Sequence, residues 1–262
     1  MIRVGVIGAV GRMGRNVVEA VGSADDLVLT AVVDPAIAEL PLDGAVCQVA
    51  TVADLPDGVA DVLVDFSVAR AAEEHLAPAL GRGFHVVVGT TGIARGAMEA
   101  AEAVAQGEGA GNLLVAANFA LGAVLAMRFA EIAAPYFESV EVIELHHAAK
   151  RDAPSGTSLT TAQRIADARS GAGRGDCPDP TEAMVLDGAR GAEGPGGVRI
   201  HSVRLPGLVA HEEILFGGPG EGLTIRHDSY DRISFMAGVL LAVRAVPSRP
   251  GVTVGLDALL GG

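Results

Sequence analysis

The first 22 residues contain a strand, a glycine-rich turn and a helix in immediate succession. Residues 2–7 are a short apolar run of the kind that becomes a buried parallel strand. Gly8, Gly11 and Gly14 follow at intervals of three, and residues 15–22 have a helical pattern. Gly8 and Gly11 would let the backbone turn tightly and approach a pyrophosphate, and Gly14 would let the helix lie close to the sheet. This order predicts a dinucleotide-binding unit, although the spacing G-x-x-G-x-x-G also occurs in purely structural turns.

Alternating strands and helices continue to residue 119. Strand-like runs cover residues 27–33, 61–67, 84–88 and 112–116, and helical stretches cover residues 71–81 and 97–106. In an open parallel sheet, ligands bind at the carboxyl ends of the strands. The small and polar residues after each strand should therefore line one crevice and form the cofactor site: Gly8, Ala9, Val10, Gly11, Arg12, Met13, Asp34, Phe66, Ser67, Gly89, Thr90, Thr91, Ala116, Ala117, Asn118 and Phe119. For the two threonines and Asn118, an ordinary turn is the alternative interpretation.

Asp34 ends the second predicted strand, 20 residues after Gly14. An acidic residue at this place typically accepts hydrogen bonds from the ribose hydroxyls of NAD, and its charge repels the 2′-phosphate of NADP. Pro35 follows where an NADP-preferring protein would place an arginine, although Arg12 could offset the repulsion. We therefore expect NADH to be the preferred cofactor and NADPH to be accepted less well. The alternative is a solvated carboxylate at the end of a strand.

The second half of the chain has a different pattern. A helix at residues 121–136 leads to strand-like runs at residues 140–145, 198–204, 207–216 and 222–226, and an apolar helix follows at residues 230–246. The sequence thus predicts an α/β protein with two domains. A Rossmann-like dinucleotide-binding domain with a parallel sheet would comprise residues 1–119 and 230–262. A second α+β domain with a mostly antiparallel sheet, residues 120–229, would bind the substrate and support oligomerisation.

The stretch E-L-H-H-A-A-K-R-D-A-P-S-G-T, residues 144–157, concentrates chemically active side chains. Its two histidines can move protons near neutral pH, and its lysine contributes a positive charge or a proton. A Ser-Gly-Thr turn then opens a predicted helix at residues 157–170, whose first N–H groups suit an anion. Each residue alone also fits a structural role, as a hydrogen-bonded histidine, a solvated lysine or a turn. Together they predict a site for a small anionic substrate, formed by His146, His147, Lys150, Ser155, Gly156 and Thr157.

Two details of this stretch depend on local geometry. Neighbouring side chains of a strand point to opposite faces, so His146 and His147 can face one substrate only if the strand ends or turns there. We therefore expect the strand to stop near His146. Asp152 precedes Ala153-Pro154, and we interpret it as a structural residue of the turn.

The same stretch resembles the E-x-H-H-x-x-K-x-D-A-P-S-G-T signature of the dihydrodipicolinate (4-hydroxy-tetrahydrodipicolinate) reductases, NAD(P)H enzymes of lysine and diaminopimelate biosynthesis. Every fixed position is present, and the glycine turn is similar to the family's G-x-x-G-R-M-G. The segments Gly89-Thr90-Thr91, Asn118-Phe119 and Gly207-Leu208-Val209 follow the family in the same order. The resemblance implies reduction of a cyclic, conjugated imine dicarboxylate, with a hydride from the nicotinamide and a proton to complete the reduction.

By position in the signature, the resemblance assigns roles to individual residues. His146 would be the general acid, and Lys150 a second proton donor or a cation that polarises the substrate. His147 would bind the substrate, and a carboxylate would be held by Ser155, Gly156 and Thr157. The sequence leaves open whether His146 or Lys150 delivers the proton. The family is commonly tetrameric, so a homotetramer is expected.

Charge and cysteine content narrow the range of partners. A net charge of −13 argues against nucleic acid and anionic membranes, which need a basic face. The uncharged run at residues 112–127, interrupted by Asn118 and Gly122, is shorter than the roughly 20 apolar residues of a membrane span. Cys47 and Cys177 have no CxxC or metal-ligand spacing, so we expect reduced thiols in a cytoplasmic protein and no metal site.

Two other functional hypotheses remain open at this point. One is a different NAD(P)-dependent dehydrogenase with two domains, acting on an aspartate-derived or sugar substrate. Such a chain should lack the cluster of histidines, lysine and Ser-Gly-Thr turn. The other is a cofactor-sensing regulator without catalysis, which would usually need an additional DNA- or partner-binding module.

Overall fold

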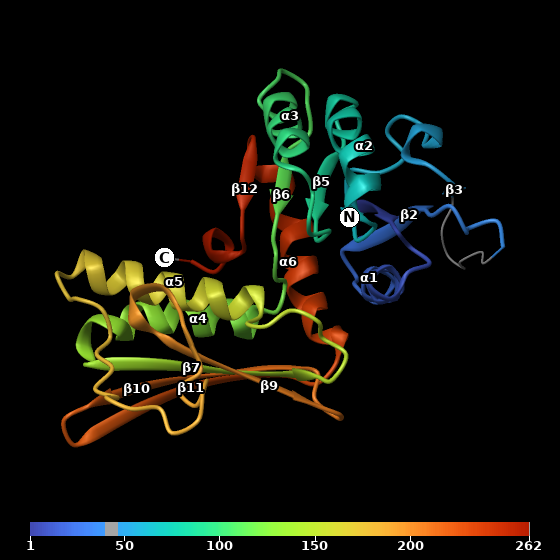
Figure 1. Ribbon diagram of the computed structural model, residues 1–262. Coiled ribbons are helices and arrows are strands. Elements are labelled where there is room, and N and C mark those ends of the chain that lie inside the picture. The colour runs from blue at the N-terminus through green and yellow to red at the C-terminus, as the bar shows by residue number, and fades with distance from the viewer. Residues whose placement is uncertain (40–46, 262) are drawn as a thin grey trace. The chain divides into compact units, whose positions relative to one another are not determined.

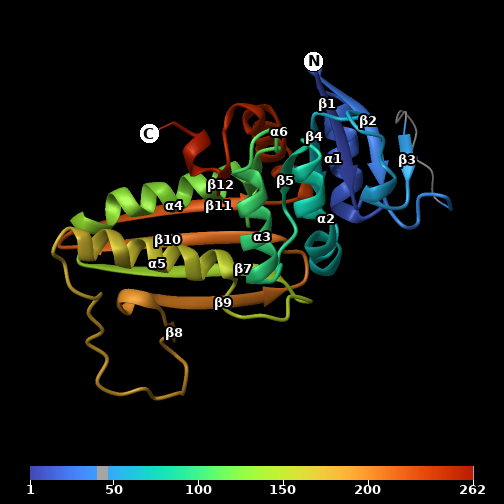
Figure 2. The same cartoon turned by 90° about the horizontal axis from the view of Figure 1, so that it is seen from above.

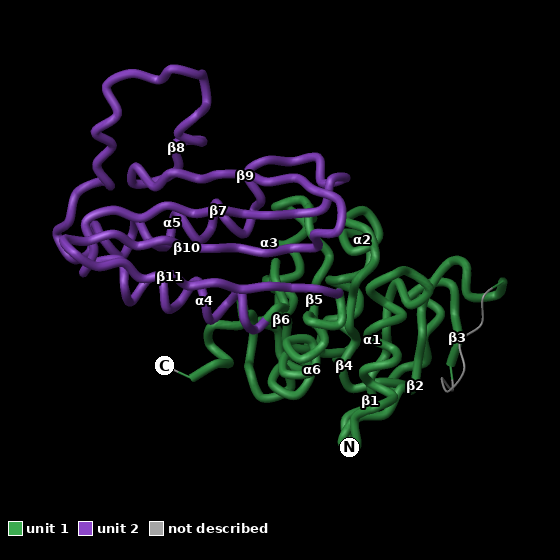
Figure 3. The backbone as a smooth tube through the Cα atoms, turned by 90° about the horizontal axis from the view of Figure 1, so that it is seen from below, with its two compact units in different colours: residues 1–120, 232–262 green, residues 121–231 purple. Residues whose placement is uncertain are grey.

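The computed structural model describes residues 1–39 and 47–261, which form two compact units (Figures 1 and 3). Unit 1 comprises Met1–Ala120 and Arg232–Gly262, and unit 2 comprises Leu121–Asp231. The first unit is therefore discontinuous in sequence, and its last helix comes after the second unit. Each unit has its own sheet and its own apolar core.

Unit 1 is built on a seven-stranded sheet with the order β12-β6-β5-β4-β1-β2-β3. All pairings between its described strands are parallel. The strands are β1 (Ile2–Ile7), β2 (Leu27–Val33), β3 (Cys47–Val49), β4 (Val62–Asp65), β5 (His85–Val88), β6 (Leu113–Val115) and β12 (Val252–Val254). Its helices are α1 (Arg12–Gly22), α2 (Ala69–Gly81), α3 (Arg95–Ala105) and α6 (Met236–Ala245). The predicted Rossmann-like parallel sheet is confirmed.

The core of unit 1 explains why these segments become strands and helices. Most residues of β1, β4 and β5 are apolar and buried, as expected for parallel strands covered on both faces, and the polar exceptions are Arg3, Asp65 and His85. Helices α2 and α3 pack against each other, and α1 contacts α6 (Figures 1 and 2). Leu76 and Leu80 of α2 join Leu63, Phe84 and Val86 in one apolar cluster. Burial of such side chains stabilises the fold by about 1.5–3 kcal/mol each.

Unit 2 contains a five-stranded mixed sheet with the order β11-β10-β7-β9-β8. The strands are β7 (Ser139–His147), β8 (Ala192–Glu193), β9 (Arg199–Leu205), β10 (Ala210–Gly218) and β11 (Glu221–Ser229). Only β7 and β9 pair in parallel, so the prediction of a mostly antiparallel sheet is confirmed. Helices α4 (Leu121–Ala133) and α5 (Gly156–Gly171) lie side by side along this sheet (Figures 1 and 2).

Alternation along the strands decides which side chains of this sheet face α4 and α5. Val140 and Val142 of β7 and Phe216 of β10 are buried in one cluster with Ala162 and Ile165 of α5. The alternate residues of these strands, including Ile143, Leu145 and Leu215, point to the opposite face and are only partly buried.

The two long predicted helices are shorter than expected, and prolines account for their C-terminal ends. The first ends at Ala133, and Pro135 lies in the 3-10 turn Ala134–Tyr136. The second is divided into a 3-10 turn (Arg232–Phe235), α6, and a further turn (Val246–Ser248) that contains Pro247. Proline lacks an N–H group and restricts the residue before it, so a regular helix stops there. No helix among residues 1–39 and 47–261 has the length and apolar character needed to cross a membrane.

Candidate functional site

The glycine turn joins the end of β1 to the start of α1. Gly8 has a φ of +75°, which favours glycine, and a Cβ added there would lie 2.8 Å from the carbonyl oxygen of Phe66. A Cβ on Gly14 would lie 2.1 Å from the carbonyl oxygen of Gly8. Helix α1 begins at Arg12 with no side-chain cap and no acidic residue in its first turn. The start of α1 therefore presents its first backbone N–H groups and a positive helix end beside the turn, and these features fit the pyrophosphate of a dinucleotide.

The carboxylate of Asp34 is already bonded within unit 1. Its Oδ2 accepts a hydrogen bond of 3.0 Å from the N–H of Val10, and its Oδ1 accepts one of 3.0 Å from the N–H of Ala36. Asp34 therefore holds the glycine turn next to the end of β2. Each carboxylate oxygen can accept more than one hydrogen bond, so Asp34 can also bind ribose hydroxyls.

The turns after β4 and β5 pack closely on one aromatic ring. A Cβ on Gly89 would lie 2.1 Å from the ring of Phe66, so only glycine fits there without a shift of that ring. The Phe66 ring also contacts Phe119, with 5.6 Å between the ring centroids. Phe119 is almost fully buried, so its side chain belongs to the packing and only its backbone can face a cofactor.

The sheet order brings the predicted cofactor residues to one edge. Strands β6, β5, β4, β1 and β2 are neighbours and run in parallel, so their carboxyl ends lie together. At this edge Thr91 and Ala117 are exposed, while Ala9 and Ala116 are buried. The side-chain oxygen of Asn118 accepts a hydrogen bond of 2.9 Å from the N–H of Ala120, as in an ordinary turn. The other predicted residues of this edge are Gly11 in the glycine turn, Arg12 and Met13 at the start of α1, and Thr90 after β5.

In unit 2, Glu144 and His146 lie on the same face of β7, two residues apart. Glu144 is fully buried, and its Oε2 lies 2.5 Å from Nδ1 of His146. Because a carboxylate can only accept, Nδ1 carries the proton and Nε2 remains for a ligand. The sequence contained this pair, but its role had not been predicted.

Arg204 of β9 completes the cluster around Glu144. Its two terminal nitrogens donate to Oε1 and Oε2 of Glu144 at 2.7 and 2.8 Å, and one of them also donates to the carbonyl oxygen of Asp152 at 2.8 Å. The parallel pairing of β7 with β9 places Arg204 opposite His146. The cluster thus consists of a buried carboxylate, a histidine and an arginine. Arg204 was not among the predicted site residues, because no local sequence pattern marks it.

Opposing effects set the charge states within this cluster. Burial alone would raise the pKa of Glu144, but the hydrogen bonds from Arg204 and His146 hold that pKa below its ordinary value. Burial lowers the pKa of His146, and the Glu144 carboxylate offsets only part of this effect, while the charges of Lys150 and Arg204 lower it further. Glu144 is therefore ionised, and His146 releases its extra proton more readily than a solvated histidine.

His147 does not share the environment of His146. Strand β7 ends at His147, so the expected end near His146 lies one residue later. Alternation then directs the exposed His147 side chain to the opposite face of the strand. Its role in substrate binding stays a prediction.

Lys150 and Asp152 follow β7 in a turn. The Nζ of Lys150 donates to both carboxylate oxygens of Asp152 at 2.8 and 2.9 Å. The pair holds the lysine side chain, which is 20% exposed, in one place. Asp152 therefore orients the Lys150 side chain, in addition to its place in the turn.

Helix α5 starts immediately after this turn. Ser155 is its N-cap and is buried, and its side chain accepts a hydrogen bond of 3.2 Å from the N–H of Ser158. The N–H of Ser155 donates to Oε1 of Glu144 at 3.2 Å, so the helix start is tied to the cluster. Gly156 is exposed, and a Cβ there would meet nothing within 4 Å. Gly156 and Thr157 therefore begin the helix beside open space, where an anion can approach the backbone.

A second buried carboxylate lies beside the cluster. Glu212 of β10 is paired with Glu144 in the sheet, and it accepts hydrogen bonds from Ser158 at 2.6 Å and Thr161 at 2.9 Å. Burial raises the pKa of Glu212, and Glu144 adds to this effect, while the two hydroxyls oppose it. Glu212 joins α5 to the sheet and was also missed by the sequence analysis.

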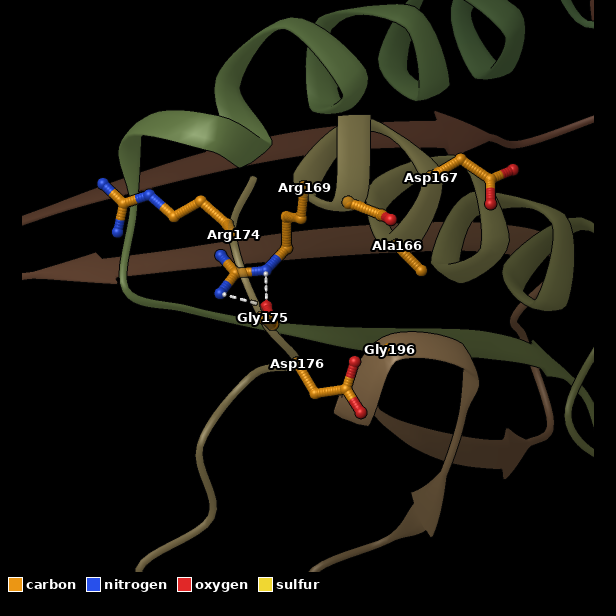
Figure 4. A pocket seen from close by; sticks show the side chains of 8 residues that line it. Ala166, Asp167, Arg169, Arg174, Gly175, Asp176 and Gly196 are labelled. Carbon is orange, nitrogen blue, oxygen red and sulfur yellow. Dashed lines mark hydrogen bonds between the residues drawn. The ribbon is translucent and has the colours of Figure 1, made fainter. Parts of the chain in front are cut away.

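A surface pocket of about 370 Å³ lies at the other end of α5, away from the helix start (Figure 4). The buried Arg169 side chain beside it donates to the carbonyl oxygens of Gly175, Ala134, Phe137 and Glu138. Because its guanidinium already holds four carbonyls, Arg169 has a structural role. The residues that line the pocket are Ala166, Asp167, Arg169, Ser170, Arg174, Gly175, Asp176 and Gly196.

Comparison with known proteins identifies the family. Residues 2–119 match the family model described as dihydrodipicolinate reductase, N-terminus, and residues 122–260 match the model of its C-terminus. The chain belongs to the dihydrodipicolinate reductase family. It is an oxidoreductase with a Rossmann-like domain of the NAD(P)-binding type. The resemblance seen in the signature stretch is thereby confirmed.

Relatives agree with this family over their whole length. A protein of Beutenbergia cavernae named 4-hydroxy-tetrahydrodipicolinate reductase is 53% identical over 260 residues, which cover 99% of this chain and 98% of that protein. A protein of the same name from Corynebacterium aurimucosum is 49% identical over 260 residues, 99% of each chain. Both support reductase activity rather than the other dehydrogenase or a regulator.

Solved structures support the same assignment. The dipicolinate-bound dihydrodipicolinate reductase of Paenisporosarcina sp. is 39% identical, has a TM-score of 0.87, and the match covers 98% of this chain and 99% of that chain. A scyllo-inositol dehydrogenase of Lactobacillus casei with bound NAD(H) has a TM-score of 0.64 at 15% identity, and covers 99% of this chain and 93% of that chain. At that identity the likeness shows the fold alone.

Proposed function

We propose that this enzyme reduces the cyclic imine dicarboxylate derived from 4-hydroxy-tetrahydrodipicolinate to tetrahydrodipicolinate, a step of lysine and diaminopimelate biosynthesis. The proposal assigns the dinucleotide to unit 1 and the substrate to unit 2. The observation that carries it is the set of bonds made by Glu144, which contacts His146, Arg204 and the N–H of Ser155. A proton donor and an anion-binding helix start are thus held in one cluster. The dipicolinate-bound relative supports a cyclic dicarboxylate as the ligand class.

The substrate carboxylates are proposed to bind around the start of α5. One would accept hydrogen bonds from the backbone N–H groups of Gly156 and Thr157, at the positive helix end that Ser155 caps. The other would pair with a cation, for which Lys150 is the candidate, with His147 contributing from the end of β7. Charge-assisted hydrogen bonds of this type are roughly twice as strong as neutral ones.

The proton is proposed to come from Nε2 of His146, and Lys150 is the alternative donor. When bound, the dinucleotide supplies the hydride that reduces the substrate ring. Glu144 keeps Nδ1 of His146 protonated, so Nε2 is the nitrogen that exchanges a proton with the substrate. Arrival of a dianion favours the charged form of His146 and opposes the effect of burial. General acid catalysis of this kind contributes on the order of 10²–10⁴-fold.

NADH is proposed as the preferred cofactor, with NADPH accepted. Asp34 would bind the ribose hydroxyls and repel a 2′-phosphate, while the exposed Arg12 would lessen that repulsion. The backbone between Gly8 and Met13 would hold the pyrophosphate. The nicotinamide half would rest on the residues after β4, β5 and β6, which are Phe66, Gly89, Thr90, Thr91, Ala116, Ala117, Asn118 and Phe119.

A cytoplasmic homotetramer is the proposed form of the enzyme. The face of the second sheet that points away from α4 and α5 carries the partly buried Ile143, Leu145 and Leu215. Further copies of the chain would cover these apolar side chains, which lie among the charged Glu141 and Glu213 of the same face. Both cysteines are free thiols, which suits a reducing compartment. Native mass spectrometry of the purified enzyme would show the subunit number directly.

A coupled assay tests the proposed reaction. The substrate is generated in place from pyruvate and aspartate semialdehyde by the preceding synthase, and oxidation of NADH and then of NADPH is followed. We expect rapid oxidation that depends on the synthase and is faster with NADH. Absence of oxidation, despite measurable NADH binding, would contradict the substrate assignment and favour another dehydrogenase substrate or a sensor.

A further inference from the structure

Asp65 is a fully buried carboxylate that the proposed reaction does not use. It is the last residue of β4 and lies between the turns that follow β4 and β5. Its Oδ1 accepts hydrogen bonds from the N–H of Ser67 at 2.8 Å and from the hydroxyl of Thr90 at 3.0 Å. Its backbone carbonyl accepts a hydrogen bond of 2.9 Å from the N–H of Gly89. One residue therefore connects both turns.

His75 of α2 is the remaining partner of this carboxylate. Its Nε2 lies 2.7 Å from Oδ2 of Asp65, and its side chain is 13% exposed. Burial alone would raise the pKa of Asp65, but the hydrogen bonds from His75 and Ser67 hold it below its ordinary value. A buried carboxylate without such a partner is strongly destabilising. His75 thus lets Asp65 remain charged beneath the two turns.

The two turns that Asp65 holds leave little space for their side chains to move. The ring of Phe66 leaves no space for a Cβ on Gly89, and it packs against Phe119 at the end of β6. A change in the position of Thr90 or Ser67 would therefore move Phe66 and alter the surface formed by the ends of β4, β5 and β6. Positions of this kind must be held closely, because a misplacement of about 1 Å between reacting groups can lower the reaction rate about a hundredfold.

We propose that Asp65 and His75 are positioning residues, which hold the turns after β4 and β5 in the shape that receives the nicotinamide half of the cofactor. This inference rests on the proposed assignment of the cofactor to unit 1. The adenine half has other contacts in that assignment, namely the glycine turn and Asp34. Loss of the His75 donor should therefore weaken binding of the whole dinucleotide. Binding of a ligand that contains only the adenosine diphosphate part should be unchanged.

The surroundings of His75 make it a suitable place for substitution. His75 lines a surface pocket of about 470 Å³, so a different side chain there does not leave a cavity in the core. The other lining residues are Val52, Ala53, Asp57, Glu74, Pro78 and Arg82. His75→Leu removes the donor at similar volume. His75→Gln keeps an N–H donor close to the position of Nε2 and is the matched control.

The test is calorimetric titration of wild type and both variants with NADH and, separately, with ADP-ribose. We expect His75→Leu to weaken NADH binding about tenfold, the equivalent of one charge-assisted hydrogen bond. ADP-ribose binding should stay within about twofold, and His75→Gln should stay near wild type for both ligands. Thermal unfolding of each variant verifies the fold, and His75→Ala replaces the leucine variant if that chain does not fold.

Two results would overturn the inference. One is unchanged NADH affinity in folded His75→Leu, and the other is an equal loss for NADH and ADP-ribose. A merely structural histidine would produce the second result, because general loosening affects both ligands. Failure of the wild-type protein to bind NADH would instead contradict the cofactor assignment itself, so the two failures are distinguishable.

Discussion

Nδ1 of His146 lies 2.5 Å from Oε2 of Glu144, and this contact leaves Nε2 as the ring nitrogen available to a ligand. The carboxylate also raises the pKa of His146 against the effect of burial. A buried acidic residue thus controls both the orientation and the proton affinity of the proposed acid.

Glu144→Gln should reduce kcat by about 10- to 100-fold and leave the KM for NADH unchanged. The amide is neutral, so it no longer raises the pKa of His146. Protonated His146 then persists only to lower pH, and the alkaline limb of the kcat profile should move to lower pH. Steady-state kinetics across a pH series measures both effects.

Glu141→Gln is the matched control for this change. Glu141 lies on the same strand and also pairs with a histidine and an arginine, His201 and Arg190, but it faces the other side of the sheet. We expect its kcat and pH profile to match wild type. Equal effects of the two substitutions would remove Glu144 from its proposed role.

His146→Gln and Lys150→Ala separate the two candidate proton donors. The donor's removal should lower kcat by about 10²–10⁴-fold, whereas removal of a purely binding cation should mainly raise the KM for the substrate. Neither change should affect the Kd for NADH, because both residues lie in unit 2. Collapse of NADH binding in either variant would show that the site is wrongly assigned.

Asp34→Asn should narrow the difference in kcat/KM between NADH and NADPH. The amide removes the charge that repels a 2′-phosphate and keeps an oxygen that can accept from the N–H of Val10 or Ala36. Asp34→Ala loses both hydrogen bonds, so it should weaken binding of both dinucleotides as well. The ratio of kcat/KM for NADH and NADPH measures the first effect, and Kd values measure the second. An unchanged ratio in both variants would remove Asp34 from cofactor selection.

The parts of this structure that could be predicted depend on local sequence patterns. The glycine turn, the apolar strands and the N-cap serine all depend on residues within a few positions of one another. The contact between Glu144 and Arg204 does not. Arg204 is 60 positions from Glu144 and reaches it only because β9 pairs in parallel with β7. No periodicity in the sequence specifies that pairing, so such partners become visible only in the folded chain.

Glu212→Gln should stabilise the enzyme at alkaline pH and have little effect in acid. Burial raises the pKa of Glu212 above its ordinary value of 4.5, so the folded chain holds this proton more tightly than the unfolded chain. As pH rises from 4.5 through the folded pKa, the unfolded chain loses the proton first, and wild type loses stability. A glutamine at this position cannot ionise, so the free energy of unfolding of the variant does not fall in this way as pH rises.

The measurement is urea unfolding of wild type and Glu212→Gln at pH 5 and pH 8. We expect the variant to be more stable by about 1 kcal/mol at pH 8 and close to wild type at pH 5. Glu213→Gln is the matched control, because the adjacent Glu213 faces the other side of β10 and pairs with Arg226. Glu213→Gln should have the same free energy of unfolding as wild type at pH 8. A variant that is less stable than wild type at pH 8 would mean that Glu212 is ionised in the folded enzyme and that its bonds to Ser158 and Thr161 need the charge.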